Sequence, residues 1–229
     1  MADLLDLFEL PLFPLNMVLF PGQILPLHIF EDRYRLMIRS CLAEEKPFGV
    51  VLIREGKEVG ETAVPHPVGT VARIMESSHL PDGTMNIVTL GIERFRILRL
   101  IYDQPYLRGE VEIFPLREPA DDPTLTRLTH QVRQRVVRYI ELIAEAAGLR
   151  IRVESIPEQP RQVGYLAAVA LQIENGEKQE LLNAGSVTCI LRAEVALLNR
   201  ENALLAWMAR TKEWPERTQS GASGFLLPN

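Results

Sequence analysis

The sequence contains little cysteine and no long apolar run. Its two cysteines, Cys41 and Cys189, lie far apart among 229 residues, so neither a disulfide framework nor a thiolate metal site is indicated. No uninterrupted apolar stretch reaches the roughly 18 residues of a membrane span. The start of the chain, Met1–Asp6, is acidic where a secretion signal would be basic. We therefore expect a cytoplasmic protein without a membrane partner.

Residues that commonly perform chemistry are also sparse. The four histidines, His28, His66, His79 and His130, are scattered without a second ligand at helical spacing, so no metal site is indicated. The Gly-Lys pair at residues 56–57 lacks the earlier glycine and the following Ser or Thr of a phosphate-binding loop. We expect no catalytic residues, no cofactor and no enzymatic activity.

The charge balance is mildly acidic. A formal net charge of −5 argues against a partner that is mainly a phosphate backbone, but it does not disfavour peptide partners. The arginines between Arg127 and Arg138 form a basic stretch, which is more typical of a solvated helix face than of a nucleic-acid site. Nucleic acid is therefore not an expected partner.

The most unusual stretch is the proline-punctuated opening from Leu10 to Glu31. Pro11, Pro14, Pro21 and Pro26 interrupt runs of Leu, Phe, Val and Ile. Proline has no backbone donor and a fixed φ, so this stretch is predicted to form short extended segments near a sheet edge.

The rest of residues 8–116 is predicted to hold one helix and several strands. Asp32 is a candidate cap for a helix whose apolar stripe runs to Leu42. The turn Pro81-Asp82-Gly83 joins two extended runs and predicts a hairpin, whereas Gly91 and Glu93 are expected to interrupt the second run. Further strands are predicted at 48–53, 95–101 and 107–114. Residues 8–116 should therefore contain six or more short strands.

The composition changes at residues 117–123, a Pro-rich and acidic linker. Apolar residues then repeat every three or four positions, which predicts a helical bundle at 124–212. Gly148 is a predicted helix stop, and Ser186 is a predicted cap of the last long helix. Residues 213–229 are predicted to be a flexible tail, whose apolar end, Phe225–Pro228, either docks as a self-peptide or stays disordered.

Distinctive short motifs follow one another along the chain. They are Leu10-Pro-Leu-Phe-Pro-Leu15, Val18-Leu-Phe-Pro-Gly22, Leu25-Pro-Leu-His-Ile-Phe-Glu31, Arg33-Tyr34 with Met37, Phe48-Gly-Val50, Gly69-Thr-Val-Ala-Arg-Ile74, Asp82-Gly83, Gly91-Ile-Glu-Arg-Phe95, Lys178-Gln179, Leu181-Leu182 and Val187. In this order they resemble the amino-terminal substrate-binding domain of the Lon ATP-dependent proteases, over residues 8–211.

This resemblance implies an α+β fold, with an amino-terminal PUA-like β pseudo-barrel that carries one helix and a carboxy-terminal α-helical bundle. The same β subdomain type occurs in cereblon, an adaptor of ubiquitin ligases. In Lon proteases the domain helps to select and hold substrate polypeptides and supports oligomer assembly, while separate ATPase and protease modules perform the chemistry. The resemblance covers only the recognition part, so we expect neither proteolysis nor ATP hydrolysis from this chain.

The leading hypothesis is a non-catalytic polypeptide-binding protein, acting as a substrate-recognition or adaptor protein in protein quality control. Its partners would be unfolded or extended polypeptide segments, and the resemblance also permits a separate protease, a chaperone or a homo-oligomer. An extended segment would add to an exposed sheet edge or place side chains in a groove between barrel and bundle. The candidate contacts are Pro11, Phe13, Pro14, Met17, Phe20, Leu25, Leu27, Phe30, Tyr34 and His66.

Three alternatives stay open at this point. Most of these candidate residues could instead form the core of the barrel. A PUA-like barrel also permits RNA binding, although the acidic balance and the lack of a basic, aromatic-rich stripe disfavour it. The third alternative is an enzyme with a minimal site that no motif reveals.

Overall fold

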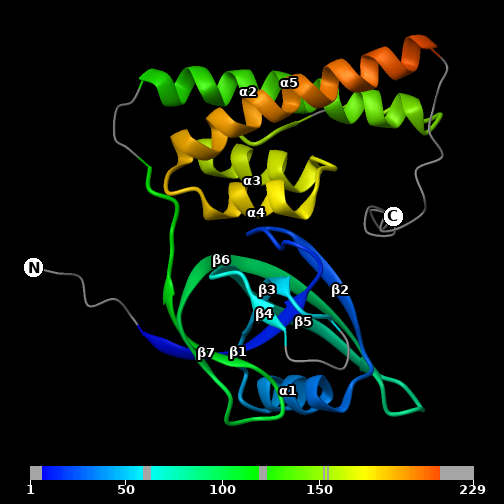
Figure 1. Cartoon of the computed structure of the whole chain (residues 1–229). Helices are drawn as coiled ribbons and strands as arrows, with labels where there is room; N and C mark the ends of the chain where they lie inside the picture. The colour runs from blue at the N-terminus through cyan, green and yellow to red at the C-terminus, as the bar shows by residue number, and fades with distance from the viewer. Residues whose placement is uncertain (1–6, 59–62, 119–122, 152, 154, 212–229) are drawn as a thin grey trace, which may run out of the picture. The chain divides into compact units, whose positions relative to one another are not determined.

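The computed structural model describes residues 7–58, 63–118, 123–151, 153 and 155–211 (Figure 1). The predicted tail and most of the predicted linker lie outside these residues. The chain forms two compact units. Unit 1 comprises Met1–Pro115 with Ile173–Asn183, and unit 2 comprises Leu116–Gln172 with Ala184–Asn229.

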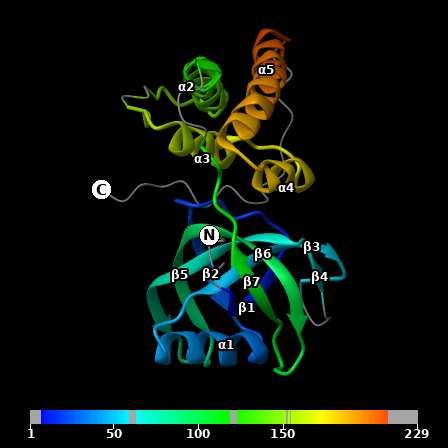
Figure 2. The same cartoon turned by 90° about the vertical axis from the view of Figure 1, so that its left-hand side faces the viewer.

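Seven strands and the first helix are described within residues 8–113, as the sequence predicts. The strands are β1 (Phe8–Leu15), β2 (Ile24–Ile29), β3 (Phe48–Glu55), β4 (Val64–Pro65), β5 (Val68–His79), β6 (Met85–Ile101) and β7 (Arg108–Ile113). Their order in the sheet is β1-β7-β6-β5-β3-β4, and a parallel pairing of β1 with β3 closes a ring. β2 stands off this ring and pairs with β6 (Figures 1 and 2).

β1 tolerates two prolines because each of its halves pairs on one side. The half with Pro11 pairs with β7, and the half with Pro14 pairs with β3. A proline nitrogen that faces the unpaired side removes no ladder hydrogen bond. The predicted extended opening segment is therefore confirmed, and β1 forms the closing strand of the barrel.

Alternate residues of the strands fill two separate cores. On β1, Leu10 and Leu12 join one cluster with Phe95, whereas Phe13 and Leu15 join the other. Successive side chains of a strand point to opposite faces, so one strand serves both clusters. The helix α1 (Asp32–Ala43) buries four residues, and all of them pack in the cluster that contains Phe13.

The hairpin of β5 and β6 is confirmed, but the predicted interruption at Gly91 and Glu93 is wrong. β6 runs through both residues without ending. A Cβ atom on Gly91 would lie 2.4 Å from the Phe20 carbonyl oxygen, so glycine permits a close approach of two backbones here. The glycine marks tight packing rather than a strand end.

The predicted cap of α1 is also wrong. Glu31 occupies the N-cap position and makes no side-chain cap hydrogen bond. Asp32 lies inside the first turn and pairs with Arg35 instead. A carboxylate in the first turn still stabilises the positive end of the helix dipole.

The helix α4 (Asn175–Asn183) lies within the predicted helical half of the sequence but groups with the sheet in unit 1. The Asn175 side chain donates a hydrogen bond of 2.6 Å to the Asn16 carbonyl, and Gln179 donates one of 3.0 Å to the Val68 carbonyl. The fully buried Arg94 donates to the Leu182 carbonyl. These contacts fall three or four residues apart and so hold one face of α4 against the barrel.

The described part of unit 2 contains three helices, α2 (Pro123–Ala146), α3 (Pro160–Ala170) and α5 (Val187–Thr211). Two predictions are confirmed here. Gly148 follows α2 with a φ of +72°, the left-handed conformation typical of a helix end. The Ser186 Oγ accepts a hydrogen bond of 3.2 Å from the Cys189 backbone N–H and caps α5.

Candidate functional site

The structure separates the ten predicted contact residues by burial. Five lie in the core of unit 1: Phe13, Pro14, Phe20, Leu25 and Tyr34. Four are half-buried: Pro11, Met17, Leu27 and His66. Phe30 is the one large apolar candidate that is well exposed, at 51%. A buried side chain offers no surface to a partner, so the available surface lies mainly around Phe30.

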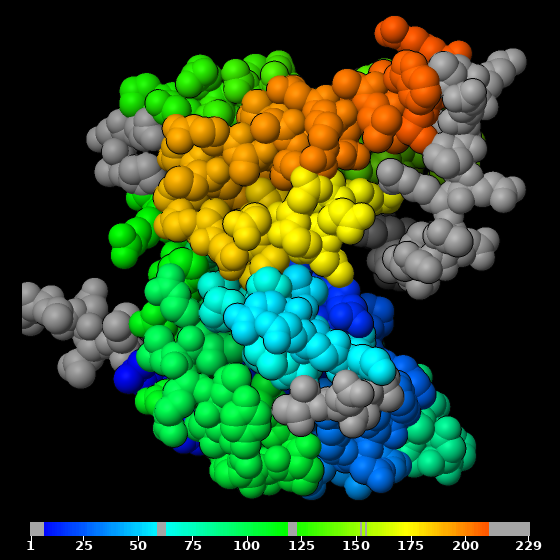
Figure 3. Space-filling model, in the orientation of Figure 1, coloured from blue at the N-terminus to red at the C-terminus, as the bar shows by residue number. Residues whose placement is uncertain are grey.

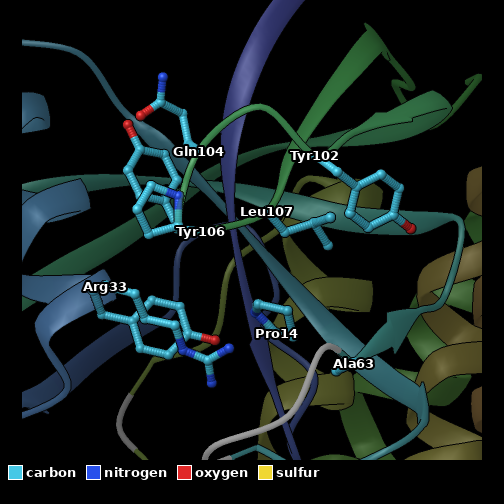
Figure 4. A pocket seen from close by; sticks show the side chains of 9 residues that line it. Pro14, Arg33, Ala63, Tyr102, Gln104, Tyr106 and Leu107 are labelled. Atoms are coloured by element: carbon cyan, nitrogen blue, oxygen red, sulfur yellow. The ribbon is translucent and has the colours of Figure 1, made fainter.

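Two of the core candidates, Pro14 and Tyr34, line a small cavity in unit 1 (Figure 4). The other lining residues are Arg33, Ala63, Tyr102, Gln104, Pro105, Tyr106 and Leu107. The figure shows Tyr102 and Tyr106 on opposite sides of Leu107. The cavity measures about 60 Å³, enough for a few water molecules or one small side chain. It is too small to hold a stretch of polypeptide.

The charges at this cavity are neutralised locally. The Arg33 Nε lies 3.0 Å from the Glu31 carboxylate, and its guanidinium stacks over the Tyr34 ring at 4.5 Å. Burial raises the pKa of Tyr34 to about 12, against an opposing effect of Arg33. A phenol with this pKa stays protonated near neutral pH, so it is a poor general base. The cavity is suited to packing rather than to proton transfer.

A larger exposed surface surrounds β2. Ile24 is 65% exposed, and it lies opposite the half-buried Leu90 in the pairing with β6. Pro26 lies opposite Val88 in the same way. Met75, at a bulge of β5 beside these strands, is 53% exposed. We name the residues Ile24, Pro26, Phe30, Met75, Val88 and Leu90 the β2 surface. Exposed and half-buried apolar side chains that share one face of a strand pair are typical of interaction sites.

Polar contacts hold the strands of the β2 surface in place. The His28 Nδ1 lies 2.7 Å from the Asn86 Oδ1 across the β2–β6 pair. Arg35 of α1 donates a hydrogen bond of 2.9 Å to the Gly83 carbonyl at the tip of the β5–β6 hairpin. The space-filling view shows this tip projecting beside the blue surface of β2 and α1 (Figure 3). These hydrogen bonds therefore fix the positions of the strands that carry the β2 surface.

Two further titratable groups among the described residues have shifted pKa values. His66 is half-buried, and burial, followed by the nearby Arg54, lowers its pKa. Burial also lowers the pKa of Lys178. Within the described residues, no three His, Cys, Asp or Glu side chains come together as metal ligands. Nor is any helix of the described part both long and apolar enough to cross a membrane.

Sequence reasoning missed Ile24, Pro26, Met75, Val88 and Leu90 as surface residues. Residues 24–30 are apolar at almost every position, so no alternation indicates which side chains face outwards. Pro26 was the available signal, since a proline within a strand indicates an edge.

Comparison with known proteins places the chain in a family. Residues 9–200 match the family model of the ATP-dependent protease La (LON) substrate-binding domain. The chain belongs to the Lon substrate-binding domain family. The α+β fold and the family expected from the motifs are thereby confirmed.

Individual relatives agree with this family assignment. The Lon protease of Anaeromyxobacter dehalogenans is 31% identical over 86% of this chain, and Lon protease 2 of Myxococcus xanthus is 29% identical over the same share. The chain spans about a quarter of the length of these two relatives, 24% of each. The matched part is the substrate-binding domain and not a catalytic one.

Solved structures also match this Lon substrate-binding domain. A Lon N-terminal domain protein from Xanthomonas campestris superposes with a TM-score of 0.60 and 29% identity, covering 87% of this chain and 98% of the other. The N-terminal domain of Lon protease from the Mycobacterium avium complex matches with a TM-score of 0.64 at 19% identity, covering 84% of this chain and 98% of the other. The second match supports the fold alone.

Proposed function

We propose that this chain is a non-catalytic polypeptide-binding protein that recognises unfolded or extended segments through the β2 surface. In this proposal it acts in the cytoplasm as a substrate-recognition or adaptor protein and delivers clients to a separate protease or chaperone. The observation that carries the proposal is the exposed apolar surface around Ile24 and Phe30 on a domain of the Lon substrate-binding family. Covering exposed apolar side chains with a client removes them from water and so lowers the free energy of the complex.

A binding measurement tests this function. The probe is fluorescein-labelled α-lactalbumin that has been reduced and carboxymethylated so that it stays unfolded, and fluorescence anisotropy reports binding. The double substitution Ile24→Ser and Phe30→Ser should weaken binding by about tenfold or more, because each lost apolar contact is worth on the order of 1 kcal/mol. The melting temperature should change little, because both side chains are exposed.

Leu98→Ser is the matched control. Leu98 is 49% exposed on the part of β6 that adjoins β7, away from the pairing with β2. It should leave client binding unchanged. Equal affinity of the double variant and the wild type would exclude the β2 surface, and a wild-type protein that binds no unfolded client would exclude the function itself.

A further inference from the structure

β2 has one edge without a strand partner among the described residues. Ile24 to Ile29 pair with Leu90 to Met85 of β6 in one continuous register. No other strand of the described chain pairs with β2. An unpaired edge presents a row of free N–H and C=O groups to any extended chain.

Pro26 indicates which backbone N–H and C=O groups of β2 point to this edge. It has no N–H, yet it lies inside an unbroken antiparallel register, so its nitrogen faces away from β6. Backbone direction alternates along a strand, and Ile24 and His28 therefore also direct their N–H and C=O groups to the free edge. The intervening Leu25 faces β6, since its carbonyl accepts a hydrogen bond of 2.9 Å from the Thr89 Oγ1.

The spacing of these free backbone groups favours an extended chain over a helix as the binding partner. Ile24 and His28 each offer one donor and one acceptor, and Pro26 offers an acceptor midway between them. Donors four residues apart on a strand are separated by about 13 Å, which matches the same spacing on another strand and not the 6 Å of four residues in a helix. The apolar Ile24 and Phe30 side chains flank the edge, without the lysines that often protect such edges.

We infer that client polypeptides bind by adding an antiparallel strand to β2, with main-chain hydrogen bonds to Ile24, Pro26 and His28. Alternate client side chains then cover the β2 surface. This inference rests on the proposed polypeptide-binding function and gives its binding mode. The client residue opposite Pro26 donates its N–H to the Pro26 carbonyl, but Pro26 has no N–H to donate in return. The pairing therefore uses two N–H donors of β2, from Ile24 and His28, and three N–H donors of the client.

Proline substitutions on the protein test the two donors. Ile24→Pro and His28→Pro together remove both free-edge N–H groups and leave the hydrogen bonds with β6 intact. The matched control combines Ile24→Ala and His28→Ala, which shortens the same side chains and keeps both donors. The proline variant should bind the unfolded α-lactalbumin about tenfold more weakly than the alanine variant, with a similar melting temperature.

A backbone scan of the client tests the same mode without changing the protein. The tightest-binding short peptide from an overlapping set of α-lactalbumin segments is N-methylated at one residue at a time. Methylation should abolish binding at every second residue over about five residues, because only alternate N–H groups face β2. This scan decides the question if the proline variant fails to fold.

The outcomes separate the binding mode from the function. If peptides bind but their N-methyl scan has no two-residue period, strand addition is wrong and polypeptide binding stands. If a folded proline variant binds as tightly as the alanine variant, strand addition at this edge is likewise wrong. If the wild-type protein binds neither the unfolded protein nor its peptides, both proposals fail.

Discussion

At the scale of single residues, Glu194 is the least expected side chain in unit 2. It is completely buried on α5, and neither carboxylate oxygen has a hydrogen-bond partner among the described residues. Its surroundings include Gly164 of α3 and the apolar Ile190 and Leu191. Burial raises the pKa of this carboxyl well above its ordinary value, because the apolar surroundings disfavour the charged form.

This raised pKa predicts a loss of stability with rising pH. The unfolded chain releases the Glu194 proton near the ordinary pKa of glutamate, whereas the folded chain keeps it to higher pH. Stability therefore falls as pH rises from the unfolded pKa towards the folded one, by at most about 1.4 kcal/mol per pH unit. Glu194→Gln cannot ionise, so its stability relative to the wild type should grow as pH rises above the ordinary pKa of glutamate, as measured by urea unfolding at a series of pH values.

Glu194→Leu provides the control for this prediction. It removes the charge and also the buried polar atoms, so it should follow the pH dependence of Glu194→Gln at a higher stability. Parallel pH curves for the wild type and both variants would contradict a buried, protonated carboxyl.

At the scale of secondary-structure elements, two glycines let the strands of the barrel close around Phe95. A Cβ atom on Gly49 would lie 2.6 Å from the Phe95 Cζ. One on Gly69 would lie 2.5 Å from the Val50 carbonyl oxygen and 2.8 Å from the same ring. A large side chain on β6 thus fills the space left by two residues without side chains on β3 and β5.

Gly69→Ala is therefore expected to destabilise the protein by about 1–3 kcal/mol, because the added methyl group forces strands or the Phe95 ring to shift. Urea unfolding measures this loss. Gly176→Ala is the control, since a Cβ atom there meets nothing within 4 Å. That change lies in α4 and should be neutral or stabilising by up to about 1 kcal/mol, given the helix propensity of alanine.

A second substitution identifies the cause of the Gly69→Ala effect. If the new methyl group clashes with Phe95, then Phe95→Leu should cost less in the Gly69→Ala background than in the wild type. Strictly additive effects would instead place the clash at the Val50 carbonyl oxygen or at the Val51 Cγ1, which lie 2.5 and 2.6 Å from the added Cβ. Equal stability of Gly69→Ala and Gly176→Ala would contradict the close strand approach.

At the scale of the whole molecule, the charge distribution favours polypeptide over nucleic-acid partners. The net charge is −5, and the basic stretch of α2 is largely engaged within unit 2. Arg135 donates a hydrogen bond of 2.7 Å to the Asn199 side chain, and Arg133 donates one of 3.4 Å to the Ile156 carbonyl. Arg138 lies 3.9 Å from the Glu141 carboxylate. These three side chains of the basic stretch are therefore engaged within unit 2, which disfavours α2 as a phosphate-binding face.

We accordingly expect no binding of a fluorescein-labelled, mixed-sequence single-stranded RNA at micromolar protein and physiological ionic strength. Fluorescence anisotropy checks this, with the unfolded α-lactalbumin as the positive control. Binding that weakens steeply with added salt would instead support the RNA-binding alternative, because counterion release makes phosphate contacts salt-dependent.

Much of the fold could be predicted because it depends on local patterns. The helical repeats, the turn at Pro81–Gly83, the cap at Ser186 and the stop at Gly148 each act over a few residues. Gly91 was misread because its role is a contact with Phe20, which is distant in sequence. The membership of α4 in unit 1 was missed for the same reason, since Gln179 and Val68 meet only in the folded chain.

By itself, the sequence determined the family, the α+β class and the proline-punctuated opening as the centre of interest, because these depend on residue order and short-range chemistry. Only the tertiary structure decided which side chains of that opening are accessible. Residues 24–30 are mostly apolar at both odd and even positions, so their pattern does not indicate which face of the strand is buried. The pairing of β2 with β6 buries Leu25 and Ile29 and leaves Ile24 and Phe30 at the surface, because a strand next to a core must bury one of its two faces.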